Sequence, residues 1–428
     1  MSQVTAILVV HDGATWLPQV VAAIASQSHS PNRTIAVNTG SVDGSDKLLS
    51  GARIKSISIN RGDGFGTAIS EAVATLPPVE SEDEWIWLLH DDSAPEHDAL
   101  EKLLETVVDR PNIAMVGPKI LGWNDRKHLL EVGISIARNG ARWTGLEDHE
   151  YDQGQHDGIF EVLSVSTAGA LIRRSVFEEL GGFDEKLDLF RDDVDFGWRV
   201  HSAGQSVIVN TDAVMYHAEA AASERREVDV DEAFLHRPLL LDRRNAAYVL
   251  LANSSWWLLP GLTFQIAMAA IFRSIGYLLA KLPGYAGDEL LAIIQLFTRP
   301  DLLRKARKMR KGKKLLSARV AKPFMPSQLL QLRNAKDDVV NWFRDKFFPA
   351  PDMRIDDKKA STISDDDELL VDESNYRKSG WYRFITSPAV GTSFLLFIYS
   401  ILLAHGRLGP IAGGALPETP KGASDLWR

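Results

Sequence analysis

Short runs of apolar and β-branched residues alternate with helical patterns from residue 5 to about residue 180. This alternation is typical of a mostly parallel sheet flanked by helices. The predicted strands are residues 5–10, 34–37, 54–58, 85–89 and 114–116, and the predicted helices are residues 16–26, 45–50, 66–75 and 98–109. Because open α/β sheets bind ligands at the carboxyl ends of their strands, we expect functional groups in the loops after the first four strands. The polar segment 124–158 is predicted to be a long loop or hairpin insertion.

The pattern changes after about residue 231, and residues 246–282 are largely apolar. Asn253, Gln265 and Arg273 interrupt this stretch and Pro260 would kink a helix, which favours interfacial helices over a clean membrane span. A helical subdomain packed on the catalytic domain is the alternative. Eight of the eleven residues 304–314 are Lys or Arg. Such a run suits an anionic cytoplasmic leaflet, where each basic residue contributes roughly 1 kcal/mol, and a solvated helix face is the alternative.

A second apolar stretch, residues 384–404, is 21 residues long, enough to cross a bilayer that needs about 20. Trp381, Tyr382 and Arg383 stand at its start as interface anchors, and Arg377 and Lys378 place that end in the cytoplasm. We therefore expect an α/β catalytic domain (1–230), a membrane-associated helical region (231–348), an acidic linker (349–383), a transmembrane helix (384–405) and a tail (406–428). The tail ends without a second anchor, which is compatible with a longer membrane protein.

Composition and charge narrow the function. The net charge of −9 argues against a nucleic-acid binder, because such proteins need a basic surface. Cysteine is absent, which excludes disulfides and thiolate metal sites. The N-terminus has no signal-peptide pattern. These features suit a cytoplasmic catalytic domain at the plasma membrane.

A pair of carboxylates ends the fourth predicted strand, in the segment His90-Asp91-Asp92-Ser93. Two carboxylates at a strand end need a counter-charge, and oxygen ligands suit Mg²⁺ or Mn²⁺ bound to a diphosphate. Capping of the following helix by Asp92 or Ser93 is the alternative reading.

Two glycine-bearing turns precede that segment. Val37 to Ser45 forms a strand, a turn and a helix N-terminus whose backbone N–H groups can hold a nucleotide. The segment from Asn60 to Gly66 repeats the arrangement with Arg61, a cation near the same sheet edge. Each turn alone is as compatible with a structural role as with a functional one.

Further along, three carboxylates crowd within four positions, at Asp192, Asp193 and Asp195. Crowding raises at least one carboxyl pKa unless Arg or a metal relieves it, a pattern expected of a general base. A helix N-terminal turn with Arg199 as an intrahelical partner is the structural alternative, and the two are compatible.

In this order, the segments over about residues 4 to 217 resemble the family 2 glycosyltransferases with the GT-A fold, especially actinobacterial rhamnosyl- and galactofuranosyl-transferases of the cell envelope. The resemblance implies a GT-A Rossmann-like mixed sheet flanked by helices. It also implies inverting transfer from a nucleoside diphosphate sugar, with Asp193 as the base that deprotonates the acceptor hydroxyl.

The resemblance further assigns the remaining site residues. The metal ligands would be Asp92, His217 and His90. The nucleotide-sugar contacts would be Val10, Asp12, Asn38, Gly40, Asp43, Asn60, Arg61, Gly64, Gly66 and Asp91. The acceptor contacts would be Gly169, Asp192, Asp195, Trp198 and Arg199. A core histidine with a hydrogen bond is the alternative for His217.

Two departures from the family pattern concern substrate and metal. Asn38 and Thr39 stand where the family usually has Asp and Asn, which leaves the nucleotide base open, and His90 replaces the first carboxylate of the Asp-x-Asp motif. Imidazole ligates Mn²⁺ better than Mg²⁺. The apolar helices and basic run suggest a lipid-linked glycan acceptor, and a homo-oligomer stays open. A nucleotidyltransferase and a degenerate domain acting as a membrane scaffold are the rival functions.

Overall fold

A ten-stranded mixed sheet forms the centre of the part of the chain that the computed structural model describes, residues 2–147, 150–187, 189–218, 238–279 and 281–327. Its strand order is β10-β12-β6-β11-β4-β1-β2-β3, with β5 paired to β12 and β7 to β6. The strands are β1 (Gln3–Val10), β2 (Arg33–Asn38), β3 (Lys55–Ser58), β4 (Glu84–His90), β5 (Ser93–Pro95), β6 (Ile113–Gly122), β7 (Leu129–Glu131), β10 (Ile159–Glu161), β11 (Leu171–Arg173) and β12 (Ser206–His217). The strands β8 (Ser135–Ile136) and β9 (Arg142–Trp143) form a separate antiparallel hairpin.

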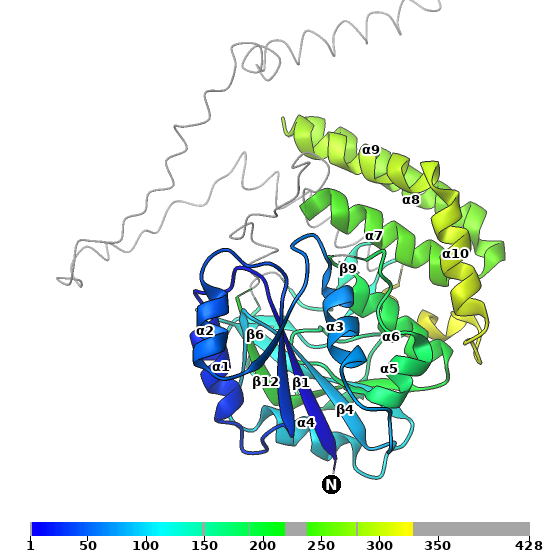
Figure 1. Cartoon of the computed structure of the whole chain (residues 1–428). Coiled ribbons are helices and arrows are strands. Elements are labelled where there is room, and N and C mark those ends of the chain that lie inside the picture. Colours follow the sequence, from blue (N-terminus) through cyan, green and yellow to red (C-terminus); the bar gives the residue numbers. More distant parts are fainter. Residues whose placement is uncertain (1, 148–149, 188, 219–237, 280, 328–428) are drawn as a thin grey trace, which may run out of the picture. The chain divides into compact units, whose positions relative to one another are not determined.

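Helices cover both faces of the sheet (Figure 1). They are α1 (Leu17–Ala25), α2 (Ser45–Gly51), α3 (Phe65–Ala74), α4 (Ala99–Val107), α5 (Arg174–Leu180) and α6 (Asp192–Ser202). One core cluster joins the sheet to apolar residues of α1, α2 and α4, and another joins it to α3, α5 and α6. The expected mixed α/β sheet flanked by helices is therefore confirmed.

The register of the central strands sets the place of the site. β1 and β4 are almost entirely buried, as expected of strands inside a parallel sheet. Val9 pairs with His90 across β1 and β4, and Val10 pairs with Asn38 across β1 and β2. The carboxyl ends of these three strands thus meet at one edge of the sheet.

The four N-terminal strands and their helices lie where the sequence predicts them. The fifth strand, predicted as 114–116, runs as β6 from Ile113 to Gly122. Its continuation was missed because Gly117 and Pro118 read as strand breakers. Gly117 is needed there, since a Cβ at this position would lie 2.3 Å from Val165 Cβ. The polar insertion holds the short strands β7, β8 and β9.

A second layer of helices follows the α/β part: α7 (Pro238–Asn253), η1 (Trp256–Leu258), α8 (Leu259–Leu279), α9 (Pro283–Thr298), α10 (Pro300–Lys311) and η2 (Ala318–Phe324). All described residues belong to one compact unit. Residues 246–252 of α7 are buried in a core cluster with Val194 and Trp198 of α6. The first seven residues of the apolar stretch therefore pack on the α/β part of the chain, as in the alternative given above.

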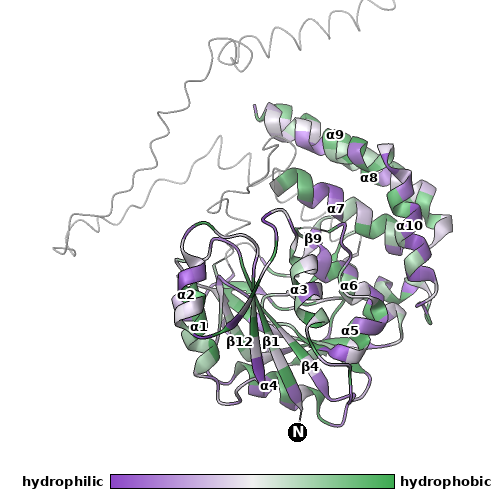
Figure 2. Ribbon diagram, viewed as in Figure 1, coloured by the Kyte–Doolittle hydropathy of each residue, from purple (hydrophilic) through white to green (hydrophobic). Residues whose placement is uncertain are grey.

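The helices α8 and α9 differ from α7 in exposure. Ile266, Ala270 and Ser274 form the buried stripe of α8, whereas Phe264 and Phe272 are more than 60% exposed. Figure 2 shows apolar segments along these helices and a hydrophilic α10. One helix, Trp256–Leu279, is long and apolar enough to cross a membrane by length and composition, a test that core helices of soluble proteins also pass. The predicted linker, transmembrane helix and tail lie outside the described residues.

Candidate active site

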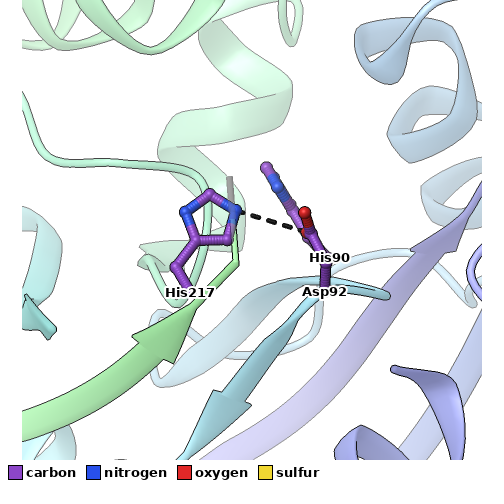
Figure 3. Close-up of side chains that lie close together, drawn as sticks. All are labelled: His90, Asp92 and His217. Carbon is purple, nitrogen blue, oxygen red and sulfur yellow. Dashed lines mark ion pairs between the residues drawn. The ribbon is translucent and has the colours of Figure 1, made fainter. Parts of the chain in front are cut away.

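The three predicted metal ligands lie close together at the carboxyl edge of the sheet (Figure 3). One ligand atom from each of His90, Asp92 and His217 lies within 4.8 Å of the others. His217 Nε2 stands 3.3 Å from Asp92 Oδ1, and the rings of His90 and His217 meet edge to face at 5.6 Å. Two imidazole nitrogens and a carboxylate oxygen form a donor set that suits a divalent transition metal such as Mn²⁺. The side chains present therefore fit the metal that the fold implies.

The backbone explains why residues so distant in sequence meet. Residues 93–95 form β5, which pairs antiparallel with the end of β12, so that His217 lies opposite Ser93. The Ser93 hydroxyl accepts a hydrogen bond from His90 N at 3.1 Å and fixes the turn between β4 and β5. His90 Nε2 is 3.0 Å from Thr167 Oγ1, and Phe65 packs against the ring at 4.8 Å. The imidazole of His90 is thereby oriented on two sides.

Asp91, the middle residue of this segment, lies on the other side of the strand end. It is 2% exposed, and its Oδ2 accepts a hydrogen bond from His11 N at 2.7 Å. A Cβ on Gly13 would lie 2.2 Å from the same oxygen. Asp91 thus holds the loop after β1, while Asp92 faces His217.

The first predicted nucleotide segment is ordered by its own side chains. Asn38 Oδ1 accepts a hydrogen bond from Ser41 N, and Asn38 Nδ2 donates to Asp46. Asp43 accepts hydrogen bonds from Ala14 N and from the Ser45 hydroxyl. Gly40 has a φ of +75°, in the left-handed region that favours glycine. The loops after β1 and β2 are therefore tied together, next to the buried end of β1 at Val10.

Arg61 joins this loop pair. Its guanidinium donates to Asp12 Oδ2 at 2.5 Å and to the carbonyl of Gly40 at 2.9 Å. Burial alone would raise the pKa of Asp12, but the hydrogen bond and charge of Arg61 hold that pKa below its usual value. Arg61 is thus engaged with Asp12 in this structure. A diphosphate bound here would have to compete with Asp12 for the Arg61 guanidinium.

The remaining residues of the second turn serve the local fold. Asn60 N donates to Asp63 Oδ2, and Gly64 is the N-cap of α3. Gly66 lies in the first turn of α3, where a Cβ would come within 2.9 Å of Phe183 Cβ. The close packing of Phe183 accounts for Gly66 without a ligand. The N-terminus of α3 still faces the same sheet edge as His90, because Phe65 contacts that ring.

The acidic cluster opens helix α6. Asp192 and Asp193 are 7% and 8% exposed. Phe190 and Arg191, just before them, have φ values of +64° and +71°. Non-glycine residues in this region cost of order 1–3 kcal/mol each and are held by surrounding structure, often at functional sites. Burial, together with the charge of Asp193, raises the pKa of Asp192 to about 7, in line with the crowding expected from the sequence.

Two residues that the sequence reasoning missed connect this turn with the metal ligands. Arg142 Nη2 lies 2.7 Å from Glu131 Oε1 and 3.5 Å from Asp193 Oδ2. Glu131 is 4% exposed, and burial raises the pKa of its carboxyl against the opposing charges of Arg142 and His217. Both residues come from the polar insertion. No periodicity or motif marks them.

The five predicted acceptor contacts separate into two groups. Asp192 opens α6 beside Asp193. Gly169 packs against Met215 and Pro118, whose side chains a Cβ at this position would approach within 3 Å. Asp195, Trp198 and Arg199 are 0%, 2% and 8% exposed among side chains of the protein. Their role as acceptor contacts stays a prediction.

Comparisons with known proteins identify the family of the chain. The model of the family described as glycosyltransferase like family 2 matches residues 4–229. The chain is 24% identical over 267 residues to an N-acetylglucosaminyl-diphospho-decaprenol L-rhamnosyltransferase of Mycobacterium tuberculosis, covering 57% of this chain and 83% of that protein. It is 26% identical over 226 residues to a dTDP-rhamnosyl transferase of Shigella flexneri, covering 48% and 72%. A solved mannosyltransferase from Pyrobaculum calidifontis, in complex with GDP-Man and Mn²⁺, matches with a TM-score of 0.40 and 15% identity, covering 75% of this chain and 86% of that one.

Proposed function

The chain belongs to the glycosyltransferase-like family 2 and is a glycosyltransferase, and we propose that it transfers a sugar, with inversion, from a nucleoside diphosphate sugar to a hydroxyl of a lipid-linked cell-envelope glycan. The observation that carries this proposal is the convergence of His90, Asp92 and His217 at the sheet edge. Asp193 Oδ2 lies 3.5 Å from Arg142 Nη2, which also pairs with the buried Glu131. Family membership also decides against the nucleotidyltransferase reading.

Asp193 is the general base of this proposal. Its carboxylate lies at the start of α6, where the helix dipole favours negative charge, and Arg142 lies 3.5 Å from its Oδ2. In the reaction, the carboxylate takes the proton of the acceptor hydroxyl while the oxygen attacks the anomeric carbon. The bond to the diphosphate breaks on the opposite face of that carbon, which inverts its configuration. General base catalysis of this kind contributes typically about 10²–10⁴-fold.

The residues His90, Asp92 and His217 would hold a divalent cation, which when bound neutralises charge on the departing diphosphate. The loops after β1 and β2, tied together through Asp43 and Arg61, form the proposed nucleotide pocket. The buried Asp91 keeps the β1 loop against that edge. Asp43, Arg61 and Asp91 thus orient the loops around the proposed nucleotide pocket.

The lipid-linked acceptor is supported by the apolar surface of the second helical layer. Trp256, Trp257, Phe264 and Phe272 are 59–73% exposed, and further exposed apolar residues line α8 and α9. Arg304, Lys308 and Lys311 are exposed on the neighbouring α10. An apolar face beside cations fits the anionic surface of the cytoplasmic leaflet.

We propose that α8 lies in the membrane interface. Arg273, in the second half of α8, forms an ion pair of 2.8 Å with the buried Glu289 of α9, which also binds Arg243 of α7. This network holds α8 in the helical layer and leaves its opposite face exposed. The name of the Mycobacterium tuberculosis relative specifies a diphospho-decaprenol acceptor, and we extend that class of acceptor to this chain.

The proposal is tested by binding and transfer measured on the same preparations. Calorimetry with UDP, GDP and dTDP in the presence of Mn²⁺ should show binding of one nucleotide, and His217→Ala should weaken it strongly. Asp193→Asn should retain that binding and lose transfer to a polyprenyl-diphosphate-linked sugar by at least about 100-fold. Binding of no nucleotide, or full transfer by Asp193→Asn, would contradict the proposal.

A further inference from the structure

The basic segment of α10 has two faces with different surroundings. Arg307 and Arg310 lie one turn apart on the same face of α10. Together with Lys314, which follows the end of the helix, they make contacts inside the protein, and Arg310 is only 5% exposed. Arg304 and Lys308 lie on the exposed side. From the sequence, the whole basic run was expected to face either a membrane surface or solvent. Arg310 instead contacts carboxylates of the α/β part of the chain, and Arg307 and Lys314 contact the end of α7.

Arg310 reaches the helix that carries the proposed base. Its Nη2 lies 2.8 Å from Asp195 Oδ1 and 2.6 Å from Asp184 Oδ2. Asp195 is fully buried, two residues beyond Asp193 in α6. Its other oxygen accepts a hydrogen bond from Arg199 Nε at 2.8 Å. The charge of Asp195 is therefore balanced by two guanidinium groups, one from its own helix and one from α10.

The rest of the network fixes the same elements. Asn253, the last residue of α7, donates to Asp195 Oδ1 at 2.7 Å. Arg199 also donates to the carbonyls of Leu180 and Gly182, so the segment between α5 and α6 is held to α6. The Tyr248 hydroxyl of α7 donates to Asp184 at 2.8 Å.

The basic helix is in turn anchored to the end of α7. Arg307 Nη1 donates to the carbonyls of Leu251 and Ser254, and Lys314 Nζ donates to the carbonyl of Asn253. The last carbonyls of a helix have no partner within the helix, so these contacts satisfy groups that burial would otherwise leave unpaired. α10 cannot move away from α6 without breaking buried, charged hydrogen bonds.

We propose that Arg310 is a positioning residue for the catalytic turn, holding helix α6 so that the Asp193 carboxylate stays aimed at the acceptor hydroxyl. This inference rests on the proposed base role of Asp193. The turn before α6 needs such support, because Phe190 and Arg191 are in the left-handed region. The helices α7 and α10 are therefore part of the catalytic unit, which extends beyond the family match that ends at residue 229.

The test is steady-state kinetics of the full chain carrying Arg310→Gln, Asp195→Asn and both substitutions together. Arg310→Gln should lower kcat at least tenfold while the Kd for the nucleoside diphosphate with Mn²⁺ stays within twofold of wild type. The double variant should lose less of its kcat than the product of the two single losses, because both single substitutions break the same ion pair between Arg310 and Asp195. Arg310→Lys keeps the positive charge but lacks the planar guanidinium group, so its kcat should lie between those of Arg310→Gln and wild type. Arg319→Gln, at an exposed arginine of η2, is the matched control, and its kcat and nucleotide Kd should equal those of wild type.

Each outcome is decisive. A folded Arg310→Gln variant with wild-type kcat overturns the proposal. If that variant does not fold, the double variant decides, and a wild-type kcat there overturns the proposal as well. Equal losses of kcat and nucleotide binding would indicate a general structural role and would also overturn it. Asp193→Asn, measured in parallel, separates the two proposals: full transfer by that variant refutes the base assignment itself, whatever Arg310 does.

Discussion

Replacing Asp192 with Asn should stabilise the protein at alkaline pH. The side chain is 7% exposed, and its Oδ2 is buried without a hydrogen-bond partner. Burial and the neighbouring Asp193 raise its pKa from 3.8 to about 7. In the unfolded chain the carboxyl ionises near pH 4, whereas in the folded protein it keeps its proton until about pH 7. The free energy of unfolding therefore falls as pH rises between these values.

The size of this effect follows from the pKa difference. One pKa unit corresponds to about 1.4 kcal/mol, so a rise of about three units costs at most about 4 kcal/mol above pH 7. An Asn side chain cannot ionise and avoids this cost. Asp192→Asn should thus match wild type near pH 4 and exceed it by up to about 4 kcal/mol at pH 8.5.

Asp195 provides the matched control with the opposite sign. Burial opposes its ionisation, but Arg310 and Arg199 hold the pKa of this carboxyl well below its usual value. Its ionised form therefore stabilises the fold above pH 4, and Asp195→Asn should destabilise the protein there. Urea unfolding of both variants and wild type at pH 5.0 and 8.5 measures the differences. An advantage of Asp192→Asn that does not grow with pH, or a loss at pH 8.5, would refute the reasoning.

Three further predictions concern other parts of the molecule. Replacing Phe264 and Phe272 with Ser should lower binding to anionic lipid vesicles by at least about 30-fold, since each exposed ring contributes roughly 1.5–3 kcal/mol when buried; Phe160→Ser, on β10, should leave cosedimentation unchanged. Gly197→Ala should lower the thermal midpoint by several degrees, because its Cβ would lie 2.4 Å from the Leu163 carbonyl oxygen; an unchanged midpoint would contradict that packing. Glu289→Gln leaves two arginines without their buried counter-charge and should cost about 3–5 kcal/mol in urea unfolding; a cost below 1 kcal/mol would count against the network.

The three predicted metal ligands lie close together, and each stands at or next to the end of a strand. His90 and Asp92 follow a buried run, and parallel strands bring their carboxyl ends to one edge. His217 was assigned by resemblance, and its pairing opposite Ser93 places it beside Asp92. Order along the chain thus carried enough information to bring the three ligands together.

Other site features could not be predicted from local pattern. Glu131 and Arg142 lie in a polar insertion, and only the fold brings them to Asp193. Trp198, one of the predicted acceptor contacts, is buried in a core cluster with residues of α7, and no local pattern indicates that packing. The inward face of α10 was missed because a run of cations does not reveal buried carboxylates more than a hundred residues earlier, such as Asp195 for Arg310. Such pairs join residues that are far apart in the sequence, and local secondary-structure propensity contains no information about them.

The pairing of β5 with β12 has a consequence for biosynthesis. Because His217 is the last residue of β12, a nascent chain that has not yet released this residue from the ribosome lacks one of the three proposed metal ligands. The ligand set is completed only when β12 has inserted between β10 and β6 and met β5. If these residues bind a metal as proposed, the affinity would arise only after about half of the 428-residue chain has been made, and a chain truncated before His217 would lack one proposed ligand.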